Sequence, residues 1–225
     1  MRNRMGIYLL GTAALAFGLT LSTKAELGVA PVITLPYTLC RILPLDFAAA
    51  TAVVYFLFVI FQLILKKNGS KGRILLQFPF SIAFSALLRL FSNRLPTPDT
   101  MLLRAFLLVV SLFATAGGIF LMVGANLIAN PADALAYAIS GVIRKNPGTG
   151  KNILDASCVC LSLLLSLAAG RGITGVGLGT VVSMVCVGRL LALFNAAGKT
   201  QLLQMTGQAS SCRNIVTGEK YAGNE

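Results

Sequence analysis

Ionisable side chains are scarce in this chain, and their types limit the chemistry that it could perform. Only five acidic residues precede position 196: Glu26, Asp46, Asp99, Asp133 and Asp155. Histidine is absent, which removes the commonest general base and the commonest metal ligand. The five cysteines lack metal-ligand spacing and are typical of small core residues. We therefore predict no enzymatic activity, no cofactor and no metal site.

Some of the polar residues could instead bind a solute. Lys24 and Glu26 follow the first apolar stretch, where a charged pair usually anchors a helix at the membrane surface. Asp133 follows Pro131, where a carboxylate usually caps a helix. The alternative to these structural roles is a binding site. The candidates for it are Lys24, Glu26, Tyr37, Asn126, Asn130, Asp133 and Tyr137. Asp155 and Arg189 form a second-choice polar pair.

The rest of the chain is strongly apolar. Of its 225 residues, 56% are hydrophobic and 12% are charged, with a mean hydropathy of +0.81. A soluble domain of this size needs more polar surface, whereas runs of about 20 apolar residues cross a bilayer. The apolar runs are Met5–Ser22, Phe47–Leu65, Ile74–Phe91, Met101–Val123, Ile153–Ala169 and Ile173–Phe194. They predict an all-α polytopic membrane protein whose transmembrane domain covers residues 1–195.

Basic residues exceed acidic ones, 19 to 7, which gives a net charge of +12. They lie between the apolar runs and not on one continuous face, which disfavours nucleic-acid binding. In a membrane protein, such an excess places basic loops in the cytoplasm beside anionic lipid. Residues 196–225 are polar without apolar periodicity, so we predict a flexible cytoplasmic tail there.

An internal repeat relates the two halves of the chain. Residues 18–39 align without a gap with residues 118–139, at an offset of 100. The identical pairs are Gly18/Gly118, Leu21/Leu121, Ala25/Ala125, Leu27/Leu127, Pro31/Pro131, Leu35/Leu135 and Tyr37/Tyr137. Weaker matches continue at offsets of 103 and 104, so repeat 1 covers about residues 5–92 and repeat 2 about 101–195. The first apolar run resembles a secretory signal, but the repeat indicates a retained helix.

The topology depends on one short segment in each half, Val32–Leu43 and Ala132–Ile143. Each would form a helix of about 18 Å, against a hydrocarbon core of about 30 Å. If both are re-entrant, each half crosses three times and the second half is inverted, a 3+3 repeat that many secondary transporters use. If both cross, the chain has eight spans and parallel halves. The basic loop Lys66–Arg73 would then be external, so the positive-inside rule favours the inverted arrangement.

Three stretches of the sequence resemble a known family. They are KAELGVAPVITLPYTLC (Lys24–Cys40), LLQFPFS (Leu75–Ser81) and GVGLGTVVSMVCVGRLLALF (Gly175–Phe194). Over about the first 195 residues, the chain is similar to the bacterial YczE/YitT-like integral membrane proteins. The resemblance implies a multi-pass protein of the bacterial cytoplasmic (inner) membrane. The family is largely uncharacterised and is described as membrane proteins or transporters.

The duplication and the paired broken segments favour a secondary transporter or permease of a small solute. The alternative is a membrane-embedded accessory or regulatory protein that acts through a protein partner or as a homo-oligomer. An inverted repeat would place a binding site near the midplane, where the two short helices approach each other. A bare helix start near Lys24 would suit an anionic or zwitterionic group, whereas Asp133 with Asn126 and Asn130 would suit a cation or ammonium.

Overall fold

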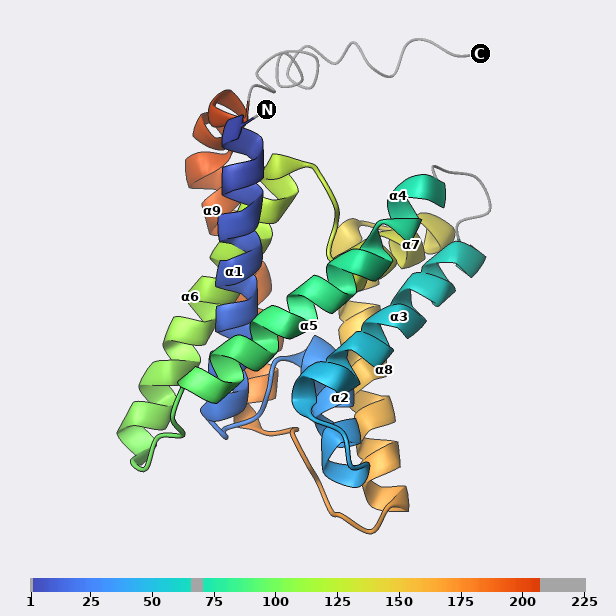
Figure 1. Ribbon diagram of the computed structural model, residues 1–225, viewed down its shortest axis with the longest axis vertical. Coiled ribbons are helices and arrows are strands. Elements are labelled where there is room, and N and C mark those ends of the chain that lie inside the picture. Colours follow the sequence, from blue (N-terminus) through green and yellow to red (C-terminus); the bar gives the residue numbers. More distant parts are fainter. Residues whose placement is uncertain (1, 66–70, 207–225) are drawn as a thin grey trace.

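The computed structural model describes residues 2–65 and 71–206, and these residues form only helices and short connections (Figure 1). In chain order, the helices are α1 (Arg2–Lys24), α2 (Pro31–Ile42), α3 (Phe47–Leu65), α4 (Lys71–Leu75), α5 (Gln77–Arg94), α6 (Met101–Ala125), α7 (Pro131–Ile143), α8 (Pro147–Ala168) and α9 (Leu178–Met205). The predicted all-α fold is therefore confirmed.

Six helical stretches of the described chain are long and apolar enough to cross a bilayer. They are formed by α1, α3, the stretch Gly72–Arg94, α6, α8 and α9. Pro79 explains why α4 and α5 are separate helices within one stretch, since a proline cannot donate to the carbonyl four residues earlier. The protein is thus a multi-pass membrane protein, as its composition predicts.

The helices α2 and α7 are too short to cross, with 12 and 13 residues. Each begins with a proline, which fits the first helical position because the N–H that it lacks has no partner there anyway. The first residues of both helices line one small cavity, together with Leu15 and Leu19 of α1 and Ile119 of α6. The two half-length helices therefore begin beside the middle of α1 and α6.

Each half-length helix packs on a long helix of the other half of the chain. α2 packs against α8, and α7 packs against α3. At the first of these contacts, the hydroxyl oxygens of Thr38 and Ser162 lie 2.5 Å apart. The Ser162 hydroxyl also donates to the Thr34 carbonyl, at 3.3 Å. The two halves therefore interlock instead of forming separate bundles.

α1 and α6 run antiparallel and cross closely. Small residues at the contact allow the close approach. A Cβ atom at Gly18 would lie 2.6 Å from the Thr115 backbone nitrogen. A Cβ atom at Gly118 would lie 2.5 Å from the Leu15 backbone nitrogen. Gly11, in turn, faces Gly118. The contacts along α1 and α6 therefore run in opposite directions. They are also reciprocal in the repeat, since Gly18 contacts Thr115 and its counterpart Gly118 contacts Leu15.

The ends of these two helices are also reciprocal. Glu26 and Asn126, aligned in the repeat, both have left-handed backbone conformations, with φ of 53° and 49°. The Arg4 guanidinium donates to the carbonyls of Ala125, at 2.9 Å, and Asn126, at 3.2 Å. Arg104, at the same offset of 100 from Arg4, pairs with the Glu26 carboxylate at 3.0 Å. The start of each helix is therefore fastened to the end of the other.

The glycine-rich loop before α9 lies against the loop that follows α1. The Gly179 N–H donates to the Leu27 carbonyl at 2.7 Å, and the Val29 N–H donates to the Gly175 carbonyl at 2.9 Å. At Gly177 a Cβ atom would lie 2.5 Å from the Leu27 carbonyl oxygen, so a side chain would separate the loops. These glycines therefore permit a close approach of two backbones.

The structure changes the predicted boundary between the last span and the tail. α9 continues to Met205, whereas we predicted that the span ends at Phe194 and that a flexible tail begins at residue 196. Leu202 is buried, and a Cβ atom at Gly124 would lie 2.0 Å from one of its methyl groups. This apolar contact with α6 explains why residues 196–205 stay helical. Residues 207–225 of the predicted tail lie outside the described residues.

The two ends of the bundle differ in charge. The start of α1, the segment α4, the end of α7 and the end of α9 lie at one end (Figure 1). The elements at this end carry basic residues, such as Arg4 of α1, Arg73 of α4 and Arg144 after α7. The exposed acids Glu26, Asp46 and Asp99 belong to the connections after α1, before α3 and before α6, and these connections lie at the opposite end (Figure 1). The positive-inside rule therefore predicts that the end with Arg144 faces the cytoplasm.

We expect Gly118→Ala to destabilise the protein by about 2 kcal/mol, because the added Cβ forces α1 and α6 apart. Gly117→Ala is the matched control, since its Cβ would have 3.9 Å to the nearest atom, a side-chain carbon of Phe194. Thermal unfolding of the purified protein in detergent measures both variants. Equal unfolding midpoints for the two variants would show that the crossing tolerates separation.

The orientation is tested by cysteine labelling in a chain whose native cysteines have been replaced. An impermeant maleimide should label Thr97→Cys in intact cells, but Lys145→Cys only after the membrane has been opened. Both positions lie in exposed connections. Protection of Thr97→Cys together with labelling of Lys145→Cys in intact cells would instead indicate the opposite orientation.

Candidate functional site

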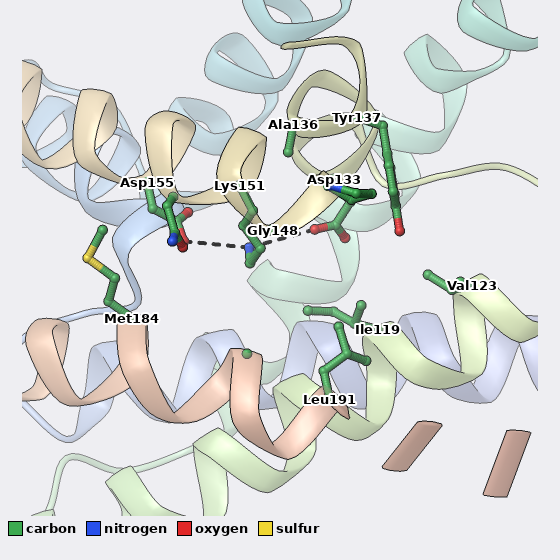
Figure 2. A pocket seen from close by; sticks show the side chains of 13 residues that line it. Ile119, Val123, Asp133, Ala136, Tyr137, Gly148, Lys151, Asp155, Met184 and Leu191 are labelled. Atoms are coloured by element: carbon green, nitrogen blue, oxygen red, sulfur yellow. Dashed lines mark ion pairs between the residues drawn. The ribbon is translucent and has the colours of Figure 1, made fainter. Parts of the chain in front are cut away.

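A cluster of three charged side chains lies between α7 and α8, within the membrane domain (Figure 2). The Lys151 ammonium lies 3.8 Å from Asp133 Oδ1 and 3.7 Å from Asp155 Oδ2. The side chain of Asp155 is 6% exposed, that of Asp133 15% and that of Lys151 26%. Charged groups inside a membrane are expensive unless they are paired, so this cluster is the strongest candidate for a functional site.

The local sequence explains how these three residues come together. Asp133 lies in the first turn of α7, where its carboxylate complements the positive end of the helix dipole. Lys151 and Asp155 are four residues apart on α8 and therefore share one face of that helix. Gly150 lets α7 approach this face, since a Cβ atom there would lie 2.2 Å from the Ala136 carbonyl oxygen.

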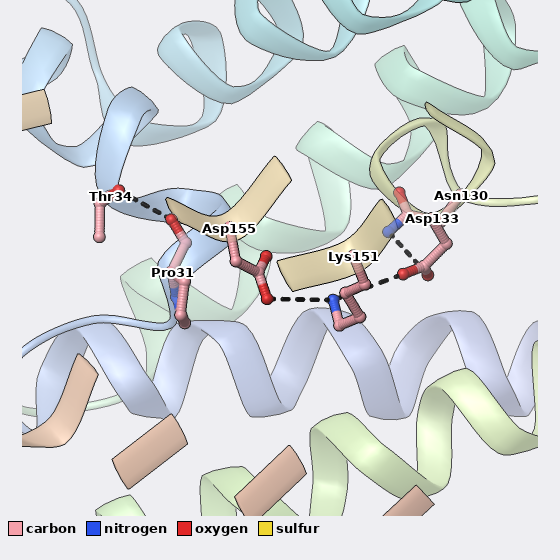
Figure 3. A network of polar contacts seen from close by, with 6 residues as sticks. All are labelled: Pro31, Thr34, Asn130, Asp133, Lys151 and Asp155. Atoms are coloured by element: carbon pink, nitrogen blue, oxygen red, sulfur yellow. Dashed lines mark hydrogen bonds and ion pairs between the residues drawn. The ribbon is translucent and has the colours of Figure 1, made fainter. Parts of the chain in front are cut away.

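Several polar atoms around the cluster are buried without a hydrogen-bond partner in the described structure. Asn130 donates from Nδ2 to Asp133 Oδ2 at 3.4 Å, but its Oδ1 atom has no partner (Figure 3). Asp155 Oδ1 and the Ser183 hydroxyl also lack partners. All three residues line the small cavity where α2 and α7 begin. Unpaired buried polar atoms are costly, so this cavity is suited to a polar guest.

A larger pocket of about 180 Å³ adjoins this cavity and shares Asp133, Lys151 and Asp155 with it. It lies between α6, α7, α8 and α9 (Figure 2). Its remaining walls are mostly apolar and include Ile119 and Leu191. A charged end and an apolar body in one pocket are typical of a site for a small organic molecule.

The structure brings together only some of the predicted site residues. Asn130, Asp133 and Tyr137 lie around the charged cluster.

Lys24, Glu26 and Tyr37 line a different pocket, of about 320 Å³, at the opposite end of the bundle. There Glu26 pairs with Arg104, and the Tyr37 hydroxyl accepts a hydrogen bond from Arg41 at 2.9 Å. The predicted set of residues is thus divided between two places. The group around Lys24 is more exposed, and its acid has a structural partner.

The remaining candidates lie elsewhere. Asn126 ends α6 in a left-handed conformation, and its carbonyl accepts the Arg4 hydrogen bond. Arg189 is exposed on α9, whereas Asp155 pairs with Lys151. The second-choice pair of Asp155 and Arg189 is therefore not an ion pair in this structure. No group of three His, Cys, Asp or Glu side chains in residues 2–65 and 71–206 could hold a metal ion.

Sequence reasoning missed Lys151. We predicted that this span starts at Ile153 and assigned Lys151 to a cytoplasmic loop, but α8 begins at Pro147. Asp155 therefore lies more than two turns inside the helix, and Lys151 one turn before it. Pro147 at the first helical position and the four-residue spacing of Lys151 and Asp155 could together have revealed the pair. Ser183 offers no such pattern.

We expect Lys151→Met to destabilise the protein by about 3 kcal/mol, because removing one partner leaves two buried carboxylates without a counter-charge. The double variant Lys151→Met/Asp155→Asn should recover much of this loss, since only one carboxylate then remains. Thermal unfolding in detergent measures both, with the exposed Lys145→Met as the control. An unchanged midpoint for the single variant would mean that the cluster contributes nothing to stability.

Comparison with known proteins gives a family without an assigned function. No curated protein and no solved structure matches this chain. Residues 2–196 match the sequence profile described as "Family of unknown function (DUF6198)", which covers nearly all the described helices and the whole site. The chain therefore belongs to the DUF6198 family of unknown function.

Proposed function

We propose that the protein is a secondary transporter, or permease, of a small solute that binds in the pocket beside Asp133, Lys151 and Asp155. One observation carries this proposal, a difference between the two halves. α5 packs along α3, whereas α9, in the corresponding place of the second half, barely touches α8. The pocket lies where α8 and α9 separate, and both helices line it. The helix pair of the second half is thus open at the place where the corresponding pair of the first half is closed.

Side-chain contacts explain why α3 and α5 stay together. The amides of Gln62 and Gln77 exchange two hydrogen bonds, at 2.9 and 3.3 Å. The rings of Tyr55 and Phe84 stack with centroids 5.6 Å apart. Near the far end, Arg89 of α5 pairs with Asp46 just before α3. A transporter requires an interface of this kind, which holds one side closed while the other is open.

The arrangement of the halves supports an alternating cycle. The antiparallel crossing of α1 and α6 is what an inverted 3+3 repeat requires, and the contacts of α2 with α8 and of α7 with α3 tie its two halves together. In such a repeat the two halves can trade conformations, so that α3 and α5 separate while α8 and α9 close. Eight parallel spans would need α1 and α6 to run in the same direction.

The proposed location is the bacterial cytoplasmic membrane, which the resemblance to the YczE/YitT-like proteins supports. Tyr137, Pro147 and Gly148 are exposed residues of the pocket, and they lie near the basic end that contains Arg144. With this end in the cytoplasm, beside anionic lipid, the pocket is open to the cell interior.

Uptake by reconstituted protein tests the proposal. Proteoliposomes are exposed to a mixture of cell metabolites, and their contents are compared by mass spectrometry with those of empty liposomes. We expect saturable enrichment of one chemical class, which Asp155→Asn abolishes and the exposed control Asp99→Asn leaves unchanged. No enrichment under any gradient would contradict transport and favour the accessory role.

A further inference from the structure

We propose that this site selects a small organic ammonium ion, which takes the place of the Lys151 ammonium beside Asp155, Asn130 and Ser183. The inference concerns the pocket of the proposed function, but the binding of the ligand does not depend on transport.

The unpaired atoms need a donor. Asp155 Oδ1 is an acceptor only, and the Ser183 hydroxyl can accept as well as donate. Asn130 Oδ1 is also an acceptor, and the buried Tyr55 hydroxyl is a donor beside the Asn130 side chain. Asn130 and Asp155 are 5% and 4% exposed and Ser183 is 1% exposed, so bulk water does not satisfy them. They come from the loop before α7, from α8 and from α9, and they line one cavity. Figure 3 shows Asn130 and Asp155 with Lys151 between them. An ammonium group carries only donors, three of them, so it can satisfy unpaired acceptors of this kind.

Lys151 is held loosely enough to be displaced. Its ammonium is 3.8 and 3.7 Å from the two carboxylates, longer than a charge-assisted hydrogen bond of about 2.7–2.9 Å. The side chain is partly exposed at the pocket, and its flexible stem allows it to move outward. Lys151 therefore behaves as a tethered cation in a place where a free ammonium would make closer contacts.

The charge of the cluster also favours a cation. Asp133 and Asp155 contribute two formal negative charges and Lys151 one positive charge, so the net charge is −1. A monovalent cation that replaces the Lys151 ammonium preserves this balance, whereas loss of the ammonium without a replacement would leave two uncompensated negative charges inside the membrane. An anion would increase that cost. The start of α2 does not offset it, since the Ala30 N–H donates to Ser22 Oγ and Pro31 has no N–H.

The adjoining wall distinguishes an organic ion from a metal ion. Beside the carboxylates, the pocket of about 180 Å³ is bounded by Ile119, Val123, Ala136 and Leu191. A hydrated inorganic cation gains nothing from these side chains, whereas an alkyl chain is desolvated by them. The ammonium end and the alkyl body of one small molecule therefore fit the two adjoining spaces.

The test uses the purified full-length protein in detergent with n-butylammonium chloride as the probe. Isothermal titration and thermal unfolding measure binding, with n-butanol, sodium butyrate and sodium chloride as matched compounds. We expect butylammonium to bind and to raise the unfolding midpoint, while the other three have little effect. An equal response to sodium chloride would overturn the proposal in favour of an inorganic cation. No response to any compound would also overturn the proposal and would indicate that only water fills the cavity.

Variants locate the binding. Asp155→Asn should weaken butylammonium binding by about tenfold or more, and Ser183→Ala by about threefold. Lys151→Met should bind it more tightly than the native protein and regain stability on binding, because the tethered competitor is gone. Asp99→Asn is the control, since Asp99 is exposed and far from the pocket in the chain. Weaker binding by Lys151→Met would contradict displacement.

The two proposals fail in different ways. Butylammonium binding without solute uptake in proteoliposomes would exclude transport but keep the ammonium site. Saturable uptake of a neutral or anionic solute would keep the transporter and exclude the ammonium site.

Discussion

The architecture depends on the constraint that a half-length helix must end inside the membrane with its backbone covered. With 12 and 13 residues, α2 and α7 do not reach across the hydrocarbon core, and irregular backbone at that depth must be enclosed by protein. α3 and α8 together enclose both short helices. Because one of these two covers comes from the opposite half in each case, neither half buries its short helix alone. The interlocked fold and the meeting of the two helix starts follow from this exchange.

A meeting of helix starts at mid-depth also explains where the charges lie. Once loop residues such as Asn130 are enclosed beside α1 and α6, polar groups become tolerable there because each one can find a protein partner. Asp133 complements the start of α7, and Lys151 then reaches it because Gly150 brings α8 close. The atoms that remain without a hydrogen bond around this cluster include those of Asn130, Asp155 and Ser183. Packing and helix capping do not explain these unpaired atoms, so we look to function for the explanation.

The sequence predicts the helices well because hydrophobic length and proline position determine them locally. The short helices at Pro31 and Pro131 and the site residues Asn130, Asp133 and Tyr137 were all foreseeable in this way. Lys151 was not, because none of the six residues from Pro147 to Asn152 is strongly hydrophobic, so hydropathy alone does not reveal the first turns of α8. The separation of Lys24 from Asp133 was hidden for another reason. It depends on how the halves pack, which no local pattern contains.

The two halves share a backbone plan but differ in the side chains that matter most. At an offset of 100, Asp133 corresponds to Ile33, and at 104, Lys151 corresponds to Phe47. The charged cluster is therefore present in one copy, although the fold around it is duplicated. A duplicated fold with two such clusters would place two sites at different depths. With one cluster beside both helix starts, the helices around the site can exchange open and closed arrangements while the site itself stays in place, which is the geometry that alternating access needs.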